Sequence, residues 1–221
     1  STLTTIAVSP VDRNRVMTGS DDGLVHLSTD GGFTWSNITD GLPNRWITRV
    51  AFDPFDADRI YVTVSGFRYD EPLPYVFMST NLGETWQPIS SNLPELPVNV
   101  LVCDPDHQGR LIVGTEAGVF YTEAYGNAWA ALQQNLPNVP VYDLKIHRPT
   151  RTLVAGTYGC SAWRLNLDLI TGQQEVSPLQ SRSLVLKPVT PNPVKQQATV
   201  EFYAPTNQQG VVKLVAPNGQ T

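Results

Sequence analysis

The chain has 221 residues, of which 41% are hydrophobic and 16% charged, and its formal net charge is −5. This composition supports a buried core, and the 16 Gly and 18 Pro favour short strands joined by tight turns. The absence of any Lys/Arg cluster disfavours nucleic acid as a partner, because phosphate binding needs a concentrated positive field. No apolar run approaches the roughly 18 residues of a membrane helix, so we expect a protein that does not span a membrane.

Four segments of the chain repeat one pattern of strand, polar turn with Pro, strand, Gly-containing turn and strand. They cover residues 3–28, 47–79, 98–122 and 141–165. The turn prolines Pro10, Pro54, Pro105 and Pro149 recur at intervals of 44, 51 and 44 residues. That spacing matches the period of about 40–50 residues for a propeller blade. The repeats predict an all-β fold, with four four-stranded antiparallel blades over residues 1–167 as part of a larger propeller.

A motif of the form S-x-D-x-G-x-T-W follows the third strand of the first three repeats. The first copy fits at every defined position, with Ser28, Asp30, Gly32, Thr34 and Trp35. The second copy has Ser79, Asn81, Gly83, Thr85 and Trp86, and the third keeps Gly126 and Trp129. A short carboxylate or amide accepts hydrogen bonds from turn amides, and Trp offers a large packing surface. The motif therefore predicts a structured turn.

These residues resemble the Asp-box, or bacterial neuraminidase, repeat of sialidases, xyloglucan-cleaving propellers and sortilin-like receptors. In that family the box is a hairpin turn between the third and fourth strands of a blade. The resemblance implies a structural role for the box carboxylates, in place of catalysis or metal binding. Because Ala124 stands where the first box has Asp30, we expect the third box to be held less firmly.

The opposite face of the predicted propeller carries the turns between second and third strands, and one of these turns is longer than the others. It contains Phe67, Arg68 and Tyr69, and Arg45 and Trp46 precede the same blade. Aromatic and ionic residues on a loop above a rigid scaffold indicate a binding site, here for an unidentified protein or glycan. Alternatively, the long loop packs over a neighbouring blade or supports an adjacent domain.

Catalytic constellations are missing from the repeats. The arginines do not form the triplet of a sialidase, and the acids lie mainly in turns, without a pair facing across a cleft. Asp143 falls on a predicted axial strand but has no evident partner, and the histidines lie in different repeats. We expect no catalytic residue, metal or cofactor here. Cys103 and Cys160, predicted on opposite faces of the propeller, are expected to be free thiols.

The repeat pattern ends near residue 167. Residues 168–182 are expected to form a final strand and linker, and residues 183–221 alternate short strands with turns, as in a partial β-sandwich. Pro191, Asn192 and Pro193 precede strands at 198–203 and 210–215. This tail resembles the C-terminal sorting domain of the type IX secretion system of Bacteroidetes. The resemblance implies an outer-membrane translocon as partner and a secreted or cell-surface location. The alternative is a generic immunoglobulin-like module.

The expected function is a noncatalytic binding scaffold on an exported protein. Two alternatives remain open: a C-terminal fragment of a secreted xyloglucanase-like glycoside hydrolase, and a structural subunit of an extracellular assembly. Because no signal peptide is present at Ser1, we expect residue 1 not to be the natural start. The fold alone does not choose among these functions.

Overall fold

The computed structural model describes residues 1–66, 71–132, 136–170, 185–186 and 202–203. The chain divides into two compact units, Ser1–Gln173 and Gln174–Thr221. Within the second unit, β16 (Val185–Leu186) pairs antiparallel with β17 (Phe202–Tyr203). Among the described residues, no helix is long and apolar enough to cross a bilayer.

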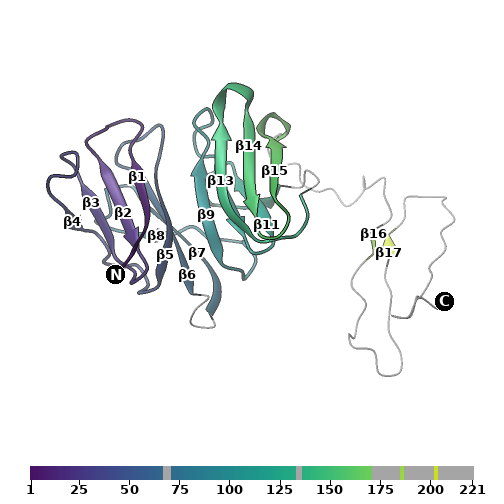
Figure 1. Cartoon of the computed structure of the whole chain (residues 1–221), viewed down its shortest axis with the longest axis horizontal. Helices are drawn as coiled ribbons and strands as arrows, with labels where there is room; N and C mark the ends of the chain where they lie inside the picture. The colour runs from purple at the N-terminus through teal and green to yellow at the C-terminus, as the bar shows by residue number, and fades with distance from the viewer. Residues whose placement is uncertain (67–70, 133–135, 171–184, 187–201, 204–221) are drawn as a thin grey trace. The chain divides into compact units, whose positions relative to one another are not determined.

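Four antiparallel sheets follow one another along the first unit, and we call them blades 1 to 4 (Figure 1). Blade 1 contains β1 (Leu3–Val8), β2 (Val16–Ser20), β3 (Val25–Ser28) and β4 (Ser36–Asn37). Blade 2 contains β5 (Trp46–Phe52), β6 (Ile60–Gly66), β7 (Glu71–Ser79) and β8 (Gln87–Pro88). Blade 3 contains β9 (Val98–Cys103), β10 (Leu111–Thr115), β11 (Gly118–Thr122) and β12 (Ala130–Ala131). Blade 4 contains β13 (Val141–His147), β14 (Thr152–Thr157) and β15 (Ala162–Asn166).

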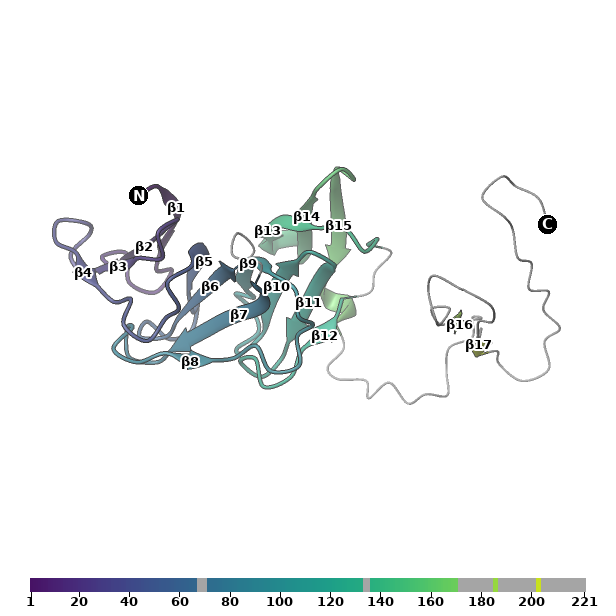
Figure 2. The ribbon, with the colours of Figure 1, turned by 90° about the horizontal axis from the view of Figure 1, so that it is seen from below.

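This arrangement confirms the predicted all-β propeller class, but blade 4 has three strands in the described residues where four were expected. In blade 4, two short 3₁₀ helices, Arg148–Thr150 and Leu167–Leu169, flank β14 and β15. The predicted final strand in residues 168–182 falls largely outside the described residues. Figure 2, turned by 90°, shows blade 2 between blades 1 and 3.

The hydrophobic core consists of three layers, each between two consecutive blades. Strands β6 and β10 are buried along their whole length, because neighbouring blades cover both of their faces. Their runs of Val and Ile suit such strands, since β-branched side chains fit a pleated surface. Between blades 1 and 2, Met17 and Leu27 pack against Ile47 and Val50. Between blades 2 and 3, Tyr61 and Val76 pack against Val98 and Leu101. Between blades 3 and 4, Val100 and Ile112 pack against Val141 and Leu144.

A β-bulge near the start of each inner strand connects consecutive blades. The bulged residue sends its side chain to a main-chain carbonyl of the next blade. Thr4 Oγ1 donates to the Ile47 carbonyl at 2.6 Å, and Thr48 Oγ1 donates to the Val98 carbonyl at 2.8 Å. The amide Nδ2 of Asn99, in blade 3, lies 3.3 Å from the equivalent carbonyl of blade 4. The polar side chain beside each inner strand therefore fixes the spacing of the blades.

A glycine in the second strand of blade 3 allows the inner strand of blade 4 to approach closely. A Cβ atom on Gly114 would lie 2.7 Å from Val141 Cγ1 of blade 4, well inside van der Waals contact. A larger residue at this position would push blade 4 away from blade 3.

Candidate functional site

The first two Asp boxes are tied by the same set of hydrogen bonds. Ser28 Oγ accepts from the Gly32 amide at 2.8 Å, and Asp30 Oδ1 accepts from the Thr34 amide at 2.9 Å. The Thr34 hydroxyl also donates to Asp30 Oδ2 at 2.6 Å. In the second box the corresponding bonds run from the Gly83 amide to Ser79 and from the Thr85 amide to Asn81, at 2.8 and 3.0 Å. Asn81 thus replaces Asp without loss of the turn.

The third box keeps fewer of these bonds. Thr122 Oγ1 accepts from the amides of Ala124 and Gly126, each at 3.2 Å. Ala124 has no side-chain oxygen to accept a later amide of the turn, and only its main-chain carbonyl accepts one, from Asn127 at 3.1 Å. This is the weaker connection expected from the sequence.

Hydrogen bonds hold the Asp30 side chain in its charged form. The Thr34 hydroxyl and amide, and then Ser28, lower the pKa of Asp30 to about 2. A carboxylate that is ionised at all ordinary pH values and occupied by turn donors cannot serve as a general acid, which needs a raised pKa.

The box tryptophans link neighbouring blades. Trp86 Nε1 donates to the Ile38 carbonyl of blade 1 at 2.9 Å, and Trp129 Nε1 donates to the Ile89 carbonyl of blade 2 at 2.8 Å. Trp35 instead donates to the Gly32 carbonyl of its own box at 3.0 Å. Each indole of the second and third boxes therefore joins its blade to the preceding one.

The structure places Arg45 and Trp46 where blade 2 begins. Arg45 Nε forms an ion pair with Glu71 Oε2 at 2.9 Å, and the Tyr75 hydroxyl donates to Glu71 Oε1 at 2.7 Å. These bonds, first from Tyr75 and then from Arg45, lower the pKa of Glu71. Trp46 is half-buried at the first position of β5. The other predicted ligand residues, 67–69, and the sorting element at 191–193 lie outside the described residues.

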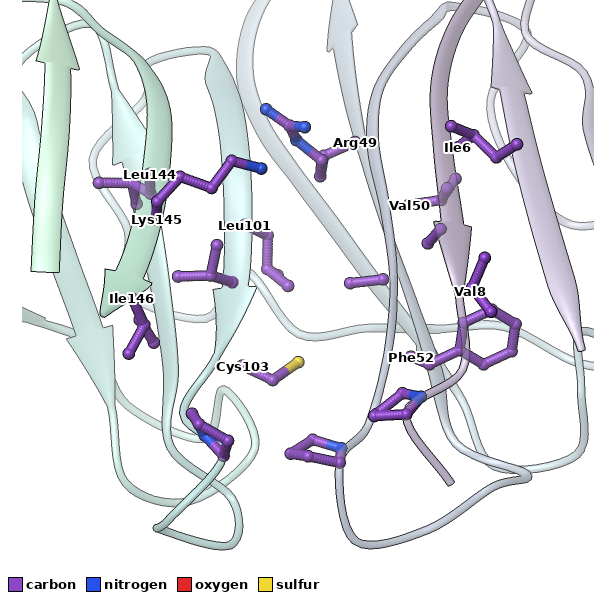
Figure 3. A pocket seen from close by; sticks show the side chains of 16 residues that line it. Ile6, Val8, Arg49, Val50, Phe52, Leu101, Cys103, Leu144, Lys145 and Ile146 are labelled. Atoms are coloured by element: carbon purple, nitrogen blue, oxygen red, sulfur yellow. The ribbon is translucent and has the colours of Figure 1, made fainter. Parts of the chain in front are cut away.

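A cavity of about 390 Å³ lies between the inner strands of all four blades. Its walls are mostly apolar, with side chains from β1, β5, β9 and β13. Figure 3 shows Arg49 and Lys145 toward one end and Cys103 and Phe52 toward the other. No Asp or Glu is among the 16 residues that line the cavity. We call this space the axial cavity.

Two cationic side chains, Arg49 and Lys145, lie at one end of the axial cavity. Arg49 Nη2 contacts Asp143 Oδ1 at 2.7 Å, which joins blade 2 to blade 4. The curvature of the propeller thus brings together two residues that are 94 apart in sequence. Arg49 Nε is buried without a hydrogen-bond partner, and Lys145 is exposed with no ion pair among the described residues. At this end of the axial cavity, the exposed ammonium group of Lys145 is thus the group that a ligand can reach.

The two cysteines are free thiols, as predicted from their separation. Cys103 lines the axial cavity, whereas Cys160 is exposed. Burial, together with the nearby carboxylates of Asp53 and Asp104, raises the pKa of the Cys103 thiol. Cys103 is therefore a protonated, weakly polar part of the cavity wall at neutral pH, and not an activated nucleophile.

Sequence reasoning did not single out the cations of the axial cavity or its walls. The repeat pattern shows which residues lie on an inner strand. The distance between inner strands of different blades depends on the curvature of the ring, which the pattern does not show. The position of Arg49 between Thr48 and Val50 was the available signal, since the equivalent residues of blades 1 and 3 are the uncharged Thr5 and Val100.

The fold and the boxes together show that this chain is an Asp-box β-propeller. The chain belongs to the Sortilin-Vps10 family (sortilin, neurotensin receptor 3), whose model matches residues 23–161. Comparison with curated proteins found no match.

Several solved structures share the fold. An ancestral GH74 enzyme has 22% identity and a TM-score of 0.57 over 70% of this chain. The GH74 xyloglucanase of Xanthomonas campestris has 15% identity and a TM-score of 0.60 over 80% of this chain. A YCF48 protein bound to D1 peptide has 17% identity and a TM-score of 0.53 over 74% of it. The chain spans 22%, 31% and 55% of the lengths of these three proteins, respectively.

Proposed function

We propose that this chain is a noncatalytic binding scaffold of an exported protein and that its ligand enters the axial cavity. The observation that carries this proposal is the composition of the cavity: apolar walls from four inner strands, with the exposed Lys145 and the Asp143-paired Arg49 at one end. Apolar walls with a few convergent polar groups are typical of a binding pocket. Glycoside hydrolysis would need two facing carboxylates, which the cavity lacks.

The chemistry of the cavity fits an extended peptide with apolar side chains and an acidic group. Apolar side chains would contact Ile6, Val8 and Ile146, and a carboxylate would meet the exposed Lys145. The fold neighbour YCF48, bound to a peptide, supports this ligand class.

Binding to synthetic peptide arrays tests the proposal, with peptides in which Leu, Phe and Glu vary. We expect Lys145→Glu to abolish the preference for acidic peptides. The matched control is Arg164→Glu, which makes the same charge change at an exposed position that does not line the cavity. Equal losses in both variants would mean that net charge, and not the cavity, determines binding.

The face around Arg45 and Trp46 is proposed as a second contact surface, together with residues 67–69. The Arg45–Glu71 pair would support the loop that carries those residues. Replacement of Phe67, Arg68 and Tyr69 by Ala together is expected to weaken binding of a protein or glycan ligand on the same arrays. Unchanged binding of every ligand that the wild-type chain recognises would remove this surface from the proposal.

Residues 183–221 are proposed to be a sorting domain for the type IX translocon, after a final strand and linker in residues 168–182. Support comes from the Pro191-Asn192-Pro193 element and the strand pattern that follows it. A reporter protein fused to residues 183–221 should be exported by a bacterium with this system and retained when its translocon is deleted. Export of the fusion without the translocon would contradict the assignment.

A second candidate function is favoured by the likeness to GH74 enzymes: the chain is part of a secreted xyloglucanase-like hydrolase. In the described residues, the carboxylates with shifted pKa values all move downward. They are Asp22, Asp30, Glu71, Asp104 and Asp106. Catalytic acids would then have to lie elsewhere in the polypeptide. Release of xyloglucan oligosaccharides by this chain alone would overturn the noncatalytic reading.

A further inference from the structure

The axial cavity has two ends that differ in chemistry. Arg49 and Lys145 lie at one of them, which we call the cation end (Figure 3). The ion pair between Arg49 and Asp143 spans this end, because it joins the inner strand of blade 2 to that of blade 4. The other end, which we call the proline end, is lined by the turn prolines of blades 1 to 3, namely Pro10, Pro54 and Pro105.

The turns that follow the inner strands form two halves of the proline end. The turns of blades 1 and 2 are joined by Arg15, whose Nη1 donates to the Ala57 carbonyl and to Asp58 Oδ1, each at 2.6 Å. The turns of blades 3 and 4 are joined by Arg151, which donates to the two carboxylate oxygens of Asp104 at 2.7 and 2.8 Å. Among the described residues, no hydrogen bond or ion pair joins the turn of blade 2 to the turn of blade 3. A ligand can therefore pass between the two halves without breaking such a bond.

The half that belongs to blades 1 and 2 carries apolar side chains at its surface. Val11 and Phe55 directly follow the lining prolines Pro10 and Pro54, and they are 51% and 44% exposed. The exposure of Phe55 does not arise from a missing neighbour, because blade 2 is in contact with blade 1 and with blade 3 (Figure 2). A large exposed apolar side chain at the edge of a cavity is a feature that a ligand can bury.

Buried hydrogen bonds hold the turn that carries Phe55. The Phe55 amide donates to Asp53 Oδ1 at 2.8 Å, and the Tyr61 hydroxyl donates to Asp53 Oδ2 at 2.7 Å. Both Asp53 and Tyr61 are buried. The position of Phe55 is thus set before a ligand arrives, so contact with it would cost little conformational entropy of the protein.

The half that belongs to blades 3 and 4 carries charged side chains instead. Asp106 occupies in the turn of blade 3 the position that Val11 and Phe55 have in theirs. It forms ion pairs with Arg148 and Arg151 at 2.7 and 2.9 Å. An apolar ligand residue would have to displace water from these charges without replacing it, so the half formed by blades 1 and 2 is the favoured side for such a residue.

The strand register sets the spacing between Lys145 and the apolar half. Ala51 is the equivalent of Lys145 in blade 2, and it precedes Phe55 by four positions. At about 3.3 Å per residue, an extended ligand needs roughly four residues to reach from one level to the other.

We propose that the ligand enters the axial cavity at the proline end and carries an apolar residue that packs on Val11 and Phe55, roughly four residues from the acidic residue that meets Lys145. This inference rests on the proposed function and specifies its ligand as an extended peptide with two recognition points. Continuity with the cavity supports this occupant, because the exposed residues of the two turns are adjacent in sequence to the prolines that line it.

Fluorescence anisotropy with labelled synthetic peptides and the 221-residue chain tests the inference. A core peptide contains one Glu and two Leu in a background of Ser and Gly. A second series adds a single Phe at increasing distance from the Glu, on either side of it. We expect Phe at roughly four residues to bind about tenfold more tightly than Ser at the same position, because it buries one further apolar side chain. Other spacings should give a smaller gain.

Two variants and a matched control locate the gain on the protein. Phe55→Ser and Val11→Ser should each reduce the ratio between the dissociation constants of the Ser and Phe peptides. Because this ratio is taken within one variant, a general loss of affinity cancels. Phe33→Ser is the control, since it removes an apolar side chain that is 90% exposed on the box turn of blade 1 and does not follow a lining proline. It should retain the full ratio.

The outcomes separate this inference from the proposed function. Binding of the core peptide with no gain from Phe at any spacing would overturn the inference alone. So would a gain that persists in both turn variants, or one that Trp46→Ser removes, since the ligand would then leave the cavity at the cation end. A core peptide that does not bind would overturn the proposed function and this inference with it. A dimer of the chain that Phe55→Ser dissociates would also overturn the inference, because a second copy would then be the occupant.

Discussion

Replacing Trp129 by Ala should reveal how much one box tryptophan contributes to a blade junction. The side chain is almost fully buried, and its indole nitrogen donates to the Ile89 carbonyl. A Trp side chain buries about 150–250 Å². At about 25 cal/mol per Å² this corresponds to roughly 4–6 kcal/mol, an upper bound because unfolded chains already bury some surface. Measured Trp→Ala costs of about 3–5 kcal/mol agree with that figure, so we expect a loss in this range.

Two further variants separate the contributions. Trp129→Phe keeps an aromatic ring but removes the indole N–H, so the Ile89 carbonyl loses its donor. We expect the free energy of unfolding to fall by about 1 kcal/mol from the lost hydrogen bond, and further because the smaller ring fills less of the site. Trp35→Ala removes the equivalent residue of a box that contacts no preceding blade, and should cost about 1 kcal/mol or less in the 221-residue chain.

Urea unfolding followed by far-ultraviolet circular dichroism gives the free energy of unfolding of each variant, without relying on the fluorescence of the residue removed. A change for Trp129→Ala below about 1 kcal/mol would refute the view that the indole holds the junction, because that value is typical of surface substitutions. Equal losses for Trp35→Ala and Trp129→Ala would refute it as well.

Three other predictions concern the boxes and the thiols. The folded pKa of Asp30 is lowered to about 2, so its contribution to stability is present above its unfolded pKa near 4 and disappears as the pH falls toward 2. The melting temperatures of Asp30→Asn and the wild type should therefore converge at acidic pH. Gly126→Ala should be strongly destabilising in urea unfolding, because its φ is 89° and a Cβ would lie 2.6 Å from the Ile89 carbonyl oxygen. An aromatic disulfide reagent should label Cys160 well before Cys103 at pH 8, since burial raises the pKa of the Cys103 thiol.

Each of these predictions has a result that contradicts it. A constant difference in melting temperature between Asp30→Asn and the wild type from pH 5 to pH 2 would show that the charge of Asp30 does not stabilise the turn. Gly31→Ala is the matched control for Gly126→Ala, because Gly31 also has a positive φ of 78° but the nearest atom to its Cβ position is Asn14 Oδ1, at 4.0 Å. Equal losses of unfolding free energy in the two variants would mean that the positive φ alone, and not the close contact with Ile89, causes the destabilisation. Simultaneous labelling of both thiols would show that Cys103 is accessible through the axial cavity.

The sequence predicted the blades well because their signals are local. A strand pattern with a turn proline and a box at a fixed offset requires only a few dozen consecutive residues. Side-chain bonds inside the box, such as that from Thr34 to Asp30, follow from the same short range. The class of fold could therefore be derived without knowing how the blades meet.

Contacts between blades were harder to predict. Trp129 was expected to offer a packing surface, but its carbonyl acceptor is 40 residues away and has no side-chain signature. The pairing of Arg49 with Asp143 depends on the curvature of the ring, which sets the distance between alternate inner strands. The axial cavity has the same origin, because each strand contributes only part of its wall. Such features are properties of the assembled blades and not of any one repeat.

The use of main-chain acceptors by the box tryptophans has a consequence for how such a protein can evolve. A carbonyl is present whatever residue occupies the acceptor position, so the donors Trp86 and Trp129 place no demand on the identity of Ile38 or Ile89 for hydrogen bonding. A gene duplication that inserts one repeat brings both a donor and an acceptor with it. The number of repeats can therefore change in a lineage without paired compensating mutations, and selection remains free to alter the inner strands.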